Sequence, residues 1–156
     1  MKINKILIIL LVMLSFSAHA AKKAPDFSLK TTKGKISLSE LKGKVVYVDF
    51  WATWCGPCRK SFPWMNEMRK KYRKQGLRIV AISLDSEKAN VAKFLKKIPA
   101  NFTIAYDPDG KVADKYKVEV MPSSYLIDRK GRIVETHLGF RDKDKQSLED
   151  VIKKHL

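Results

Sequence analysis

The strongest constraint on the fold is a continuous apolar run, Val45–Phe50, that leads within a few residues into a helical pattern. The run is rich in β-branched and aromatic side chains and holds one acid, Asp49, which predicts a strand buried on both faces. Further along, apolar residues recur at every third or fourth position, which predicts a helix over Arg59–Gln75 that Gly76 ends. Pro63 lies within this helix and is expected to kink it.

The remainder of the chain keeps alternating between strand and helix patterns. The expected elements are a hairpin of Phe27–Leu29 and Lys35–Leu38, a buried strand Leu77–Leu84, a helix Ser86–Lys97 begun by Asp85 or Ser86, a strand Phe102–Tyr106, a turn Asp107–Gly110, two hairpin strands Ser124–Ile127 and Ile133–Thr136, and a closing helix around Leu148, Val151 and Ile152. This order predicts an α/β domain with a central mixed sheet flanked by helices.

Residues 1–20 have the three-part pattern of a secretory signal peptide. Two lysines begin it, an apolar run follows, and the small residues Ala18 and Ala20 form a cleavage site. A membrane-spanning helix needs about 20 mostly apolar residues, and this run is shorter and contains serines and a histidine. Cleavage between Ala20 and Ala21 is therefore favoured over a retained anchor. The expected mature chain is one domain, residues 21–156, in the periplasm or an equivalent exported compartment, where disulfides persist.

The chain is strongly basic, with Lys+Arg 32 against Asp+Glu 16 and a formal net charge of +16. Removal of residues 1–20 takes away two lysines and no acid, which leaves 30 basic and 16 acidic side chains and a net charge of +14. A basic cluster follows the middle of the first predicted helix; its members are Arg69, Lys70, Lys71, Arg73, Lys74 and Arg78. No nucleic-acid motif or aromatic platform accompanies it, so a solvated face is favoured over a nucleic-acid site. Any partner of this face would be an acidic protein or an anionic membrane surface.

The only two cysteines lie in the motif Trp54-Cys55-Gly56-Pro57-Cys58, at the junction of the predicted strand and helix. At a helix N-terminus, free backbone N–H groups and the positive end of the helix dipole stabilise a thiolate. Pro57 suits the first turn of a helix. The motif therefore predicts a redox pair in which Cys55 attacks a disulfide and Cys58 resolves the mixed disulfide.

Two other uses of the cysteines are weaker. A purely structural bridge across so small a loop would stabilise the fold by only about 2 kcal/mol. A metal site needs further ligands, usually a second pair of Cys or His residues. The expected mature chain holds only His137 and His155, which are not at ligand spacing. Neither a metal nor an organic cofactor is therefore expected.

Three segments carry a resemblance to a known family. Asp49–Cys58 closely resembles the active-site segment of thioredoxins. Ala24–Leu29 and Leu38–Lys44 resemble exported thioredoxins of the TlpA/ResA/DsbE group, and Tyr116–Asp128 is similar to that group's second signature. The resemblance runs from Ala24 to the C-terminus. It implies a thioredoxin fold with an N-terminal β-hairpin extension and a central helix–strand insertion.

The resemblance also implies roles for individual residues. Asp49 matches the buried acid beneath the active site that helps to move the proton of Cys58, and burial raises the pKa of a carboxyl group toward the range that suits this exchange. Pro122 matches a cis-proline that faces the active site. Met121, before it, is expected to offer backbone groups to an extended substrate, the alternative being an ordinary proline at the start of a strand.

Five further residues receive expectations of their own. Trp54 is expected to flank the site as an apolar contact surface, with Trp51 packed below it. Gly139 matches a glycine beside the substrate groove, and its alternative is a simple turn glycine. His137 is expected to be a surface strand residue rather than a ligand or base. Ser61 stands where many TlpA/ResA-type sequences carry a glutamate, which weakens the transfer of a role in cytochrome maturation.

The leading interpretation is an exported thiol–disulfide oxidoreductase that reduces protein disulfides and maintains redox homeostasis outside the cytoplasm. Gly-Pro between the cysteines is the thioredoxin pairing, which resembles reductants more than strong oxidants. The implied partners are disulfide- or thiol-containing exported proteins and a membrane thiol electron donor. We expect a monomer without a stable membrane anchor and without a nucleic-acid partner.

Two rivals use the same cysteines. A peroxiredoxin-type peroxidase shares the lead-in, but its cysteine needs an upstream Pro-x-x-x-Thr-x-x-Cys pattern. Here Thr53 stands two positions before Cys55 and the proline is absent from the motif. A copper chaperone would use Cys55 and Cys58, with Met121 or His137 as a further ligand.

Overall fold

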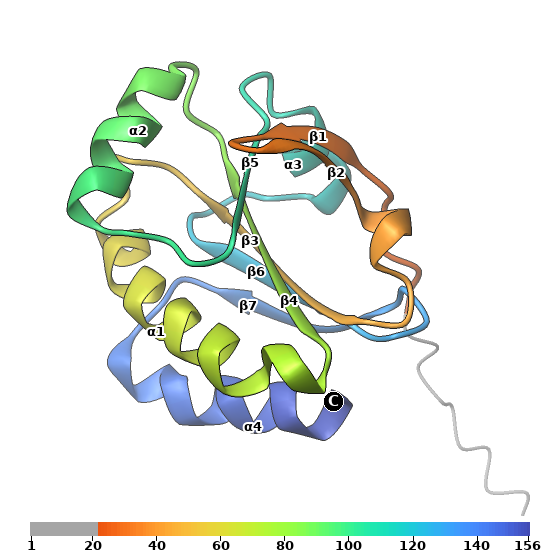
Figure 1. Cartoon of the computed structure of the whole chain (residues 1–156). Coiled ribbons are helices and arrows are strands. Elements are labelled where there is room, and N and C mark those ends of the chain that lie inside the picture. The colour runs from red at the N-terminus through yellow and green to blue at the C-terminus, as the bar shows by residue number, and fades with distance from the viewer. Residues whose placement is uncertain (1–21) are drawn as a thin grey trace, which may run out of the picture.

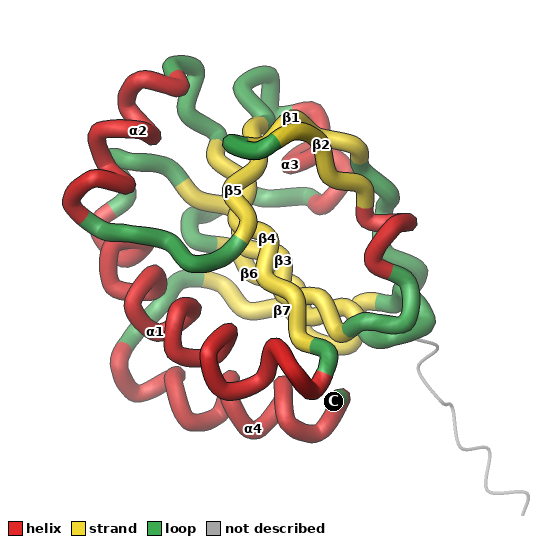
Figure 2. The backbone as a smooth tube through the Cα atoms, viewed as in Figure 1, coloured by secondary structure: helices red, strands yellow, loops and turns green. Residues whose placement is uncertain are grey.

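The computed structural model describes residues 22–156, so the predicted signal peptide and its cleavage point lie outside the described residues. The elements are β1 (Ser28–Thr31), β2 (Gly34–Ser37), η1 (Leu38–Leu41), β3 (Val45–Trp51), α1 (Gly56–Tyr72), η2 (Arg73–Gln75), β4 (Leu77–Ser83), α2 (Lys88–Lys97), β5 (Thr103–Tyr106), α3 (Lys111–Tyr116), β6 (Ser123–Ile127), β7 (Ile133–Leu138), η3 (Asp142–Asp144) and α4 (Lys145–His155). Figures 1 and 2 show the helices arranged around a twisted central sheet.

The sheet is mixed, with the strand order β2-β1-β5-β4-β3-β6-β7. The neighbours β3 and β4 run parallel, as do β4 and β5. The remaining neighbours are antiparallel. The predicted α/β class, with a central mixed sheet flanked by helices, is confirmed.

The central strand β3 faces two separate apolar cores, because successive side chains of a strand point to opposite faces. All of its residues are buried, as the apolar run predicted. Tyr47 and Trp51 belong to the core that α1, α2 and α4 cover. Val48 and Phe50 belong to the core that α3 and the N-terminal segment cover. Asp49 has the parity of Tyr47 and Trp51, so it faces the side of the sheet on which α1 lies.

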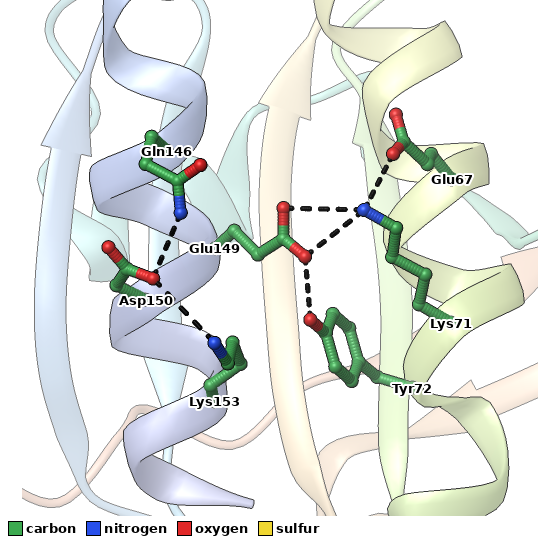
Figure 3. A network of polar contacts seen from close by, with 7 residues as sticks. All are labelled: Glu67, Lys71, Tyr72, Gln146, Glu149, Asp150 and Lys153. Atoms are coloured by element: carbon green, nitrogen blue, oxygen red, sulfur yellow. Dashed lines mark hydrogen bonds and ion pairs between the residues drawn. The ribbon is translucent and has the colours of Figure 1, made fainter.

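Helices α1 and α4 lie side by side and are joined by polar contacts (Figure 3). Glu149 of α4 accepts a hydrogen bond of 2.6 Å from the hydroxyl of Tyr72 and one of 3.2 Å from Nζ of Lys71. Lys71 also forms an ion pair of 2.7 Å with Glu67, one turn earlier on α1. The hydrogen bond from Tyr72 is the main reason why the pKa of Glu149 is lowered. These contacts fix the C-terminal half of α1 against the last helix.

The predicted N-terminal hairpin is confirmed, with strand bounds that differ from those expected. Its strands are β1 and β2, joined by the turn residues Thr32 and Lys33. It also extends the central sheet, because Thr31 of β1 pairs with Ala105 of β5. The extension is therefore continuous with the sheet that carries the cysteine motif.

The starts of two helices were predicted wrongly, and one helix was not predicted. Helix α1 begins at Gly56 rather than Arg59, so the second cysteine lies in its first turn, and the helix continues through Pro63. Helix α2 begins at Lys88 rather than at Asp85 or Ser86. Helix α3 was missed altogether. Within residues 22–156, no helix has both the length and the apolar character needed to cross a membrane.

A side chain of the preceding turn caps the start of the missed helix α3. Oδ2 of Asp107 accepts hydrogen bonds of 2.9 Å from the backbone N–H groups of Val112 and Ala113. These groups lack partners within the helix, so the aspartate side chain replaces the missing acceptors. Gly110, with φ +68°, lets the chain turn into the helix.

Candidate active site

The two cysteines lie where β3 ends and α1 begins. Cys55 is the N-cap residue of α1, Pro57 occupies the first turn, and Cys58 follows within the helix. A disulfide joins the two cysteines, whose Cα atoms are 5.3 Å apart. Sγ of Cys55 accepts a hydrogen bond of 3.2 Å from the backbone N–H of Cys58. A thiolate at Cys55 would be stabilised by the same N–H group and by the helix dipole.

The cysteines differ in their access to solvent. Cys55 is 4% exposed and Cys58 is fully buried. Cys55 is therefore the more accessible cysteine of the pair.

The loop before Cys55 is tied to the end of β4 by Asp85. Its carboxylate accepts hydrogen bonds of 2.9 Å from the backbone N–H of Thr53 and 2.6 Å from the Thr53 hydroxyl. The hydroxyl of Ser83 donates a third bond of 2.9 Å. Asp85 was predicted to begin a helix, and this role was not predicted. Parallel pairing of the strands that precede both residues was the signal that could have found it, since it brings their ends to one edge.

Asp49 lies beneath the motif, on the face of the sheet against which α1 packs. It is 1% exposed, and its Oδ1 accepts a hydrogen bond of 2.7 Å from the hydroxyl of Ser124 on β6. Oδ2 has no hydrogen-bond partner among residues 22–156. Burial raises the pKa of Asp49 to about 7, although the bond from Ser124 acts in the opposite direction. A carboxyl group of this kind can both accept and release a proton near neutral pH.

A second loop, before β6, lies on the other side of Cys55. The bond between Met121 and Pro122 is cis. Among the described residues, the backbone N–H and C=O of Met121 make no hydrogen bond, so both are available to an extended chain. Gly139, with φ +78°, donates its N–H to the carbonyl of Pro122 at 2.7 Å. The end of β7 therefore holds the proline loop in place.

A shallow groove runs beside Cys55 between these two loops. Its walls are Trp54, Cys55, Gly56, Pro57, Leu84, Val118, Glu119, Val120 and Met121. Trp54 is 71% exposed and Val120 is 48% exposed, which is unusual for large apolar side chains. Apolar groups held in the open beside a reactive group are typical of a contact surface for another protein. Trp54 was predicted to flank the site, whereas Val120 was not predicted.

The other predicted residues fall in different places. Trp51 is buried and packs against Phe62 and Phe94 with ring centroids 4.6 and 4.8 Å away. Ser61 is buried, and its hydroxyl donates to the carbonyl of Cys58 at 3.0 Å. His137 lies in β7 as expected, but it is not a surface residue: its side chain is only 20% exposed.

The described residues offer little to a metal ion. No group of three His, Cys, Asp or Glu side chains within residues 22–156 is arranged to hold one. The basic cluster lies at the other end of α1 from Cys55, and six of the residues that line the open cleft beside it are Thr31, Lys33, Lys35, Arg69, Arg73 and Arg78. The cluster therefore does not contribute to the cysteine site.

Comparison with known proteins identifies a family and several similar thiol-disulfide oxidoreductases. The chain matches the AhpC/TSA family over residues 20–136. Thiol-disulfide oxidoreductase ResA of Bacillus cereus is 40% identical over 134 residues, which are 85% of this chain and 76% of that protein. ResA of Bacillus subtilis (strain 168) is 41% identical over 124 residues, 79% of this chain and 69% of that protein.

Two solved structures are similar in fold. One, from Chlorobium tepidum and assigned as thiol:disulfide interchange protein DsbE, is 50% identical with a TM-score of 0.85. The match covers 86% of this chain and 96% of that one. The other, StoA from Bacillus subtilis, is 27% identical with a TM-score of 0.69. That match covers 81% of this chain and 96% of the StoA chain.

Proposed function

Since this chain belongs to the AhpC/TSA family, as a thioredoxin-like thiol–disulfide oxidoreductase related to ResA, we propose that it reduces disulfides of exported proteins outside the cytoplasm. The observation that carries the proposal is the position of the cysteine pair: Cys55 at the N-terminus of α1 beside an apolar groove, and Cys58 buried behind it. Maintenance of redox homeostasis in that compartment is the corresponding cellular role.

The first step forms a mixed disulfide. The thiolate of reduced Cys55 attacks one sulfur of the substrate disulfide, which breaks the substrate S–S bond and releases its other sulfur as a thiolate. Trp54 and Val120 contact the apolar side chains of the substrate, while the free backbone groups of Met121 hydrogen-bond to its extended chain. Pro122 and Gly139 hold this loop in place.

The second step releases the reduced substrate. The carboxylate of Asp49 takes the proton of the Cys58 thiol, and the resulting thiolate attacks Sγ of Cys55. The Cys55–Cys58 disulfide forms and the second substrate sulfur leaves as a thiolate, so two electrons have passed from the cysteine pair to the substrate. Reduction by a membrane thiol carrier, through the reverse of these exchanges, restores the dithiol.

The remaining parts of the proposal concern location and assembly. The three-part N-terminal pattern supports cleavage at Ala20–Ala21 and a mature periplasmic domain of residues 21–156. The mature protein then works as a monomer without a stable anchor, and its partners are exported proteins with disulfides or thiols.

Trapping of partners tests the proposal. Cys58→Ser cannot resolve the mixed disulfide, so it should accumulate covalent adducts through Cys55 when expressed in its native compartment. Mass spectrometry of the adducts identifies the substrates, and Cys55→Ser is the matched control that should trap none. Equal yields from both variants would contradict the assignment of Cys55 as the attacking group.

The peroxidase alternative makes a different prediction. A peroxidase that reacts through Cys55 would keep robust peroxide turnover in Cys58→Ser. We expect that variant to lack robust peroxide turnover while wild-type protein reduces insulin disulfides. The copper alternative predicts tight stoichiometric Cu(I) binding that His137→Ala abolishes. Among residues 22–156, His137 does not join the cysteines in any group of three His, Cys, Asp or Glu side chains arranged to hold a metal ion.

A further inference from the structure

Asp49 is buried, so a proton that it takes from Cys58 needs a route out of the core. The only hydrogen bond that its carboxylate makes among residues 22–156 comes from the hydroxyl of Ser124 on β6, at 2.7 Å. The direct partner of Ser124 on the neighbouring strand β7 is His137. Opposed residues of antiparallel strands point to the same face with Cβ atoms about 5 Å apart. The buried acid is thus connected, through one hydroxyl, to the neighbourhood of an imidazole.

Ser124 and His137 also line one small cavity under this face of the sheet. Tyr47 and Glu135 complete its polar lining, and the remaining walls are apolar: Leu126, Leu148, Val151 and Ile152. The cavity has room for about one water molecule. Nε2 of His137 is buried and has no hydrogen-bond partner among the described residues. No hydrogen bond holds this nitrogen, and the charged group nearest to it is the carboxylate of Asp144.

The far side of His137 leads to the surface. Its Nε2 lies 3.3 Å from Oδ2 of Asp144, close enough for an ion pair when the imidazole is protonated. Nε of Arg141 donates to the same oxygen at 3.0 Å, and the Arg141 side chain is 65% exposed. An imidazolium would therefore be stabilised by a carboxylate at the rim of the domain.

We propose that Ser124 and His137 form the route by which Asp49 exchanges its proton with solvent. This inference rests on the proposed function, in which Asp49 accepts the proton of Cys58. The carboxyl proton of Asp49 passes to Oγ of Ser124 as the hydroxyl proton of Ser124 passes to His137, directly or through one water. His137 then releases one proton to solvent, and no electrons move. Because it touches neither cysteine, His137 is a positioning residue that acts through Asp49.

The charged and titratable groups around His137 are few. They are Tyr47 and Asp49 from β3, Glu135 from β7, Asp144 from η3 and Arg141 just before η3, while α4 presents apolar side chains. Burial raises the pKa of Tyr47 above its ordinary value, so this phenol stays protonated and cannot replace the imidazole as the group that exchanges with solvent. Glu135 is exposed and lies on the rim.

The test measures the second step alone in the full mature chain. Reduced protein is mixed with an aromatic disulfide that gives two sequential releases of coloured thiol, the first from Cys55 attack and the second from resolution by Cys58. At about pH 6 most Asp49 carries a proton that must leave before Cys58 can be deprotonated. His137→Ala should there slow the second release about tenfold or more, and at about pH 9, where Asp49 is already ionised, the two proteins should agree.

Free imidazole supplies the readout that a structural role would not move. Added at millimolar concentration, it should restore the second release of His137→Ala at about pH 6 and leave wild type unchanged. Ser124→Ala should show the same pH-dependent defect, which keeps the inference testable if the histidine variant folds poorly. His155→Ala, the other histidine of the described chain, is the matched control and should behave as wild type.

These variants distinguish a failure of the proton route from a failure of the proposed function. If Asp49→Asn slows the second release and neither His137→Ala nor Ser124→Ala does, the route is wrong while the proposed function stands. A defect of equal size at both pH values that imidazole does not restore would also overturn the route. If Asp49→Asn itself leaves the second release unchanged, the proposed role of Asp49 fails.

Discussion

Asp49 shows how a single residue can be useful to the chemistry and costly to the fold. An ordinary aspartate has a pKa of 3.8, and burial raises that of Asp49 to about 7. The folded state therefore holds a proton more tightly than the unfolded state, and its stability falls as pH rises from about 4 to about 7. Above that window the ionised, buried carboxylate remains as a constant penalty.

Replacement of Asp49 by Asn should therefore stabilise the protein, and only at higher pH. The difference between the two pKa values corresponds to about 4 kcal/mol, so the free energy of unfolding of Asp49→Asn should exceed that of wild type by several kcal/mol at about pH 8. The gain should vanish toward about pH 4. Urea unfolding across this range measures it. A difference that does not change with pH would mean that Asp49 titrates as an ordinary aspartate.

Trp54 and Trp51 allow the loss of a groove contact to be compared with the loss of a core contact. Trp54 is 71% exposed, whereas Trp51 is fully buried. We expect Trp54→Ala to leave stability within about 0.5 kcal/mol but to lower kcat/KM for a protein disulfide about tenfold, with little effect on a small disulfide. Trp51→Ala should instead cost about 3–5 kcal/mol of stability. Equal losses of Trp54→Ala on both substrates would show that Trp54 affects Cys55 itself rather than substrate contact.

At this scale the sequence predicted the residues that a short motif contains. Cys55 and Cys58 follow from their spacing at a strand–helix junction, and the burial of Asp49 follows from the apolar run around it. Ser124 and Asp85 could not be assigned, because their partners are 75 and 32 residues away. Only the pairing register of the strands brings such groups together, and that register is a property of the whole sheet.

Among the elements, those with a strong local pattern were predicted best. Consecutive residues show the pattern of apolar side chains in three of them: the strand around Val48, the body of α1 and the final hairpin. Helix α3 has six residues, too few for a clear period, and depends on Asp107 for its start. The start of α2 was misplaced because Asp85 binds the active-site loop instead of capping a helix.

The loop before Cys55 should depend on this aspartate. In Asp85→Asn, one oxygen is replaced by an NH2 group that cannot accept the bonds from Thr53 or Ser83, so about 2 kcal/mol of stability should be lost. Asp109→Asn is the control: Asp109 is exposed and makes a single surface ion pair with Lys111, so the change should be close to zero. Thermal unfolding compares the two, and similar shifts would contradict the proposed anchoring.

In the molecule as a whole, the cysteine pair and the basic cluster lie at opposite ends of α1. Cys55 precedes its first residue, and most of the basic cluster follows its middle. A helix of 17 residues is about 25 Å long. Within residues 22–156, only Lys71 of the cluster forms an ion pair. Arg59 and Lys60 are exposed directly after Cys58, but Trp54 and Val120 make the groove beside Cys55 largely apolar. The basic cluster is therefore a surface far from that groove.

Removing positive charges from the basic cluster should therefore leave the reaction of Cys55 with a disulfide unchanged. The variant Arg69→Gln, Arg73→Gln, Lys74→Gln lowers the net charge by three, yet its cations lie well beyond the screening length of about 8 Å at physiological salt. The rate of Cys55 with a neutral small disulfide should stay within about twofold of wild type at that salt, because no field from the cluster reaches the sulfur. With an acidic protein substrate, association should become slower at low salt and less dependent on salt, since long-range attraction acts on the whole charged molecule. Stopped-flow measurements at low and physiological salt separate the two effects. A loss with the small disulfide at physiological salt would show that the cluster acts on the cysteines after all.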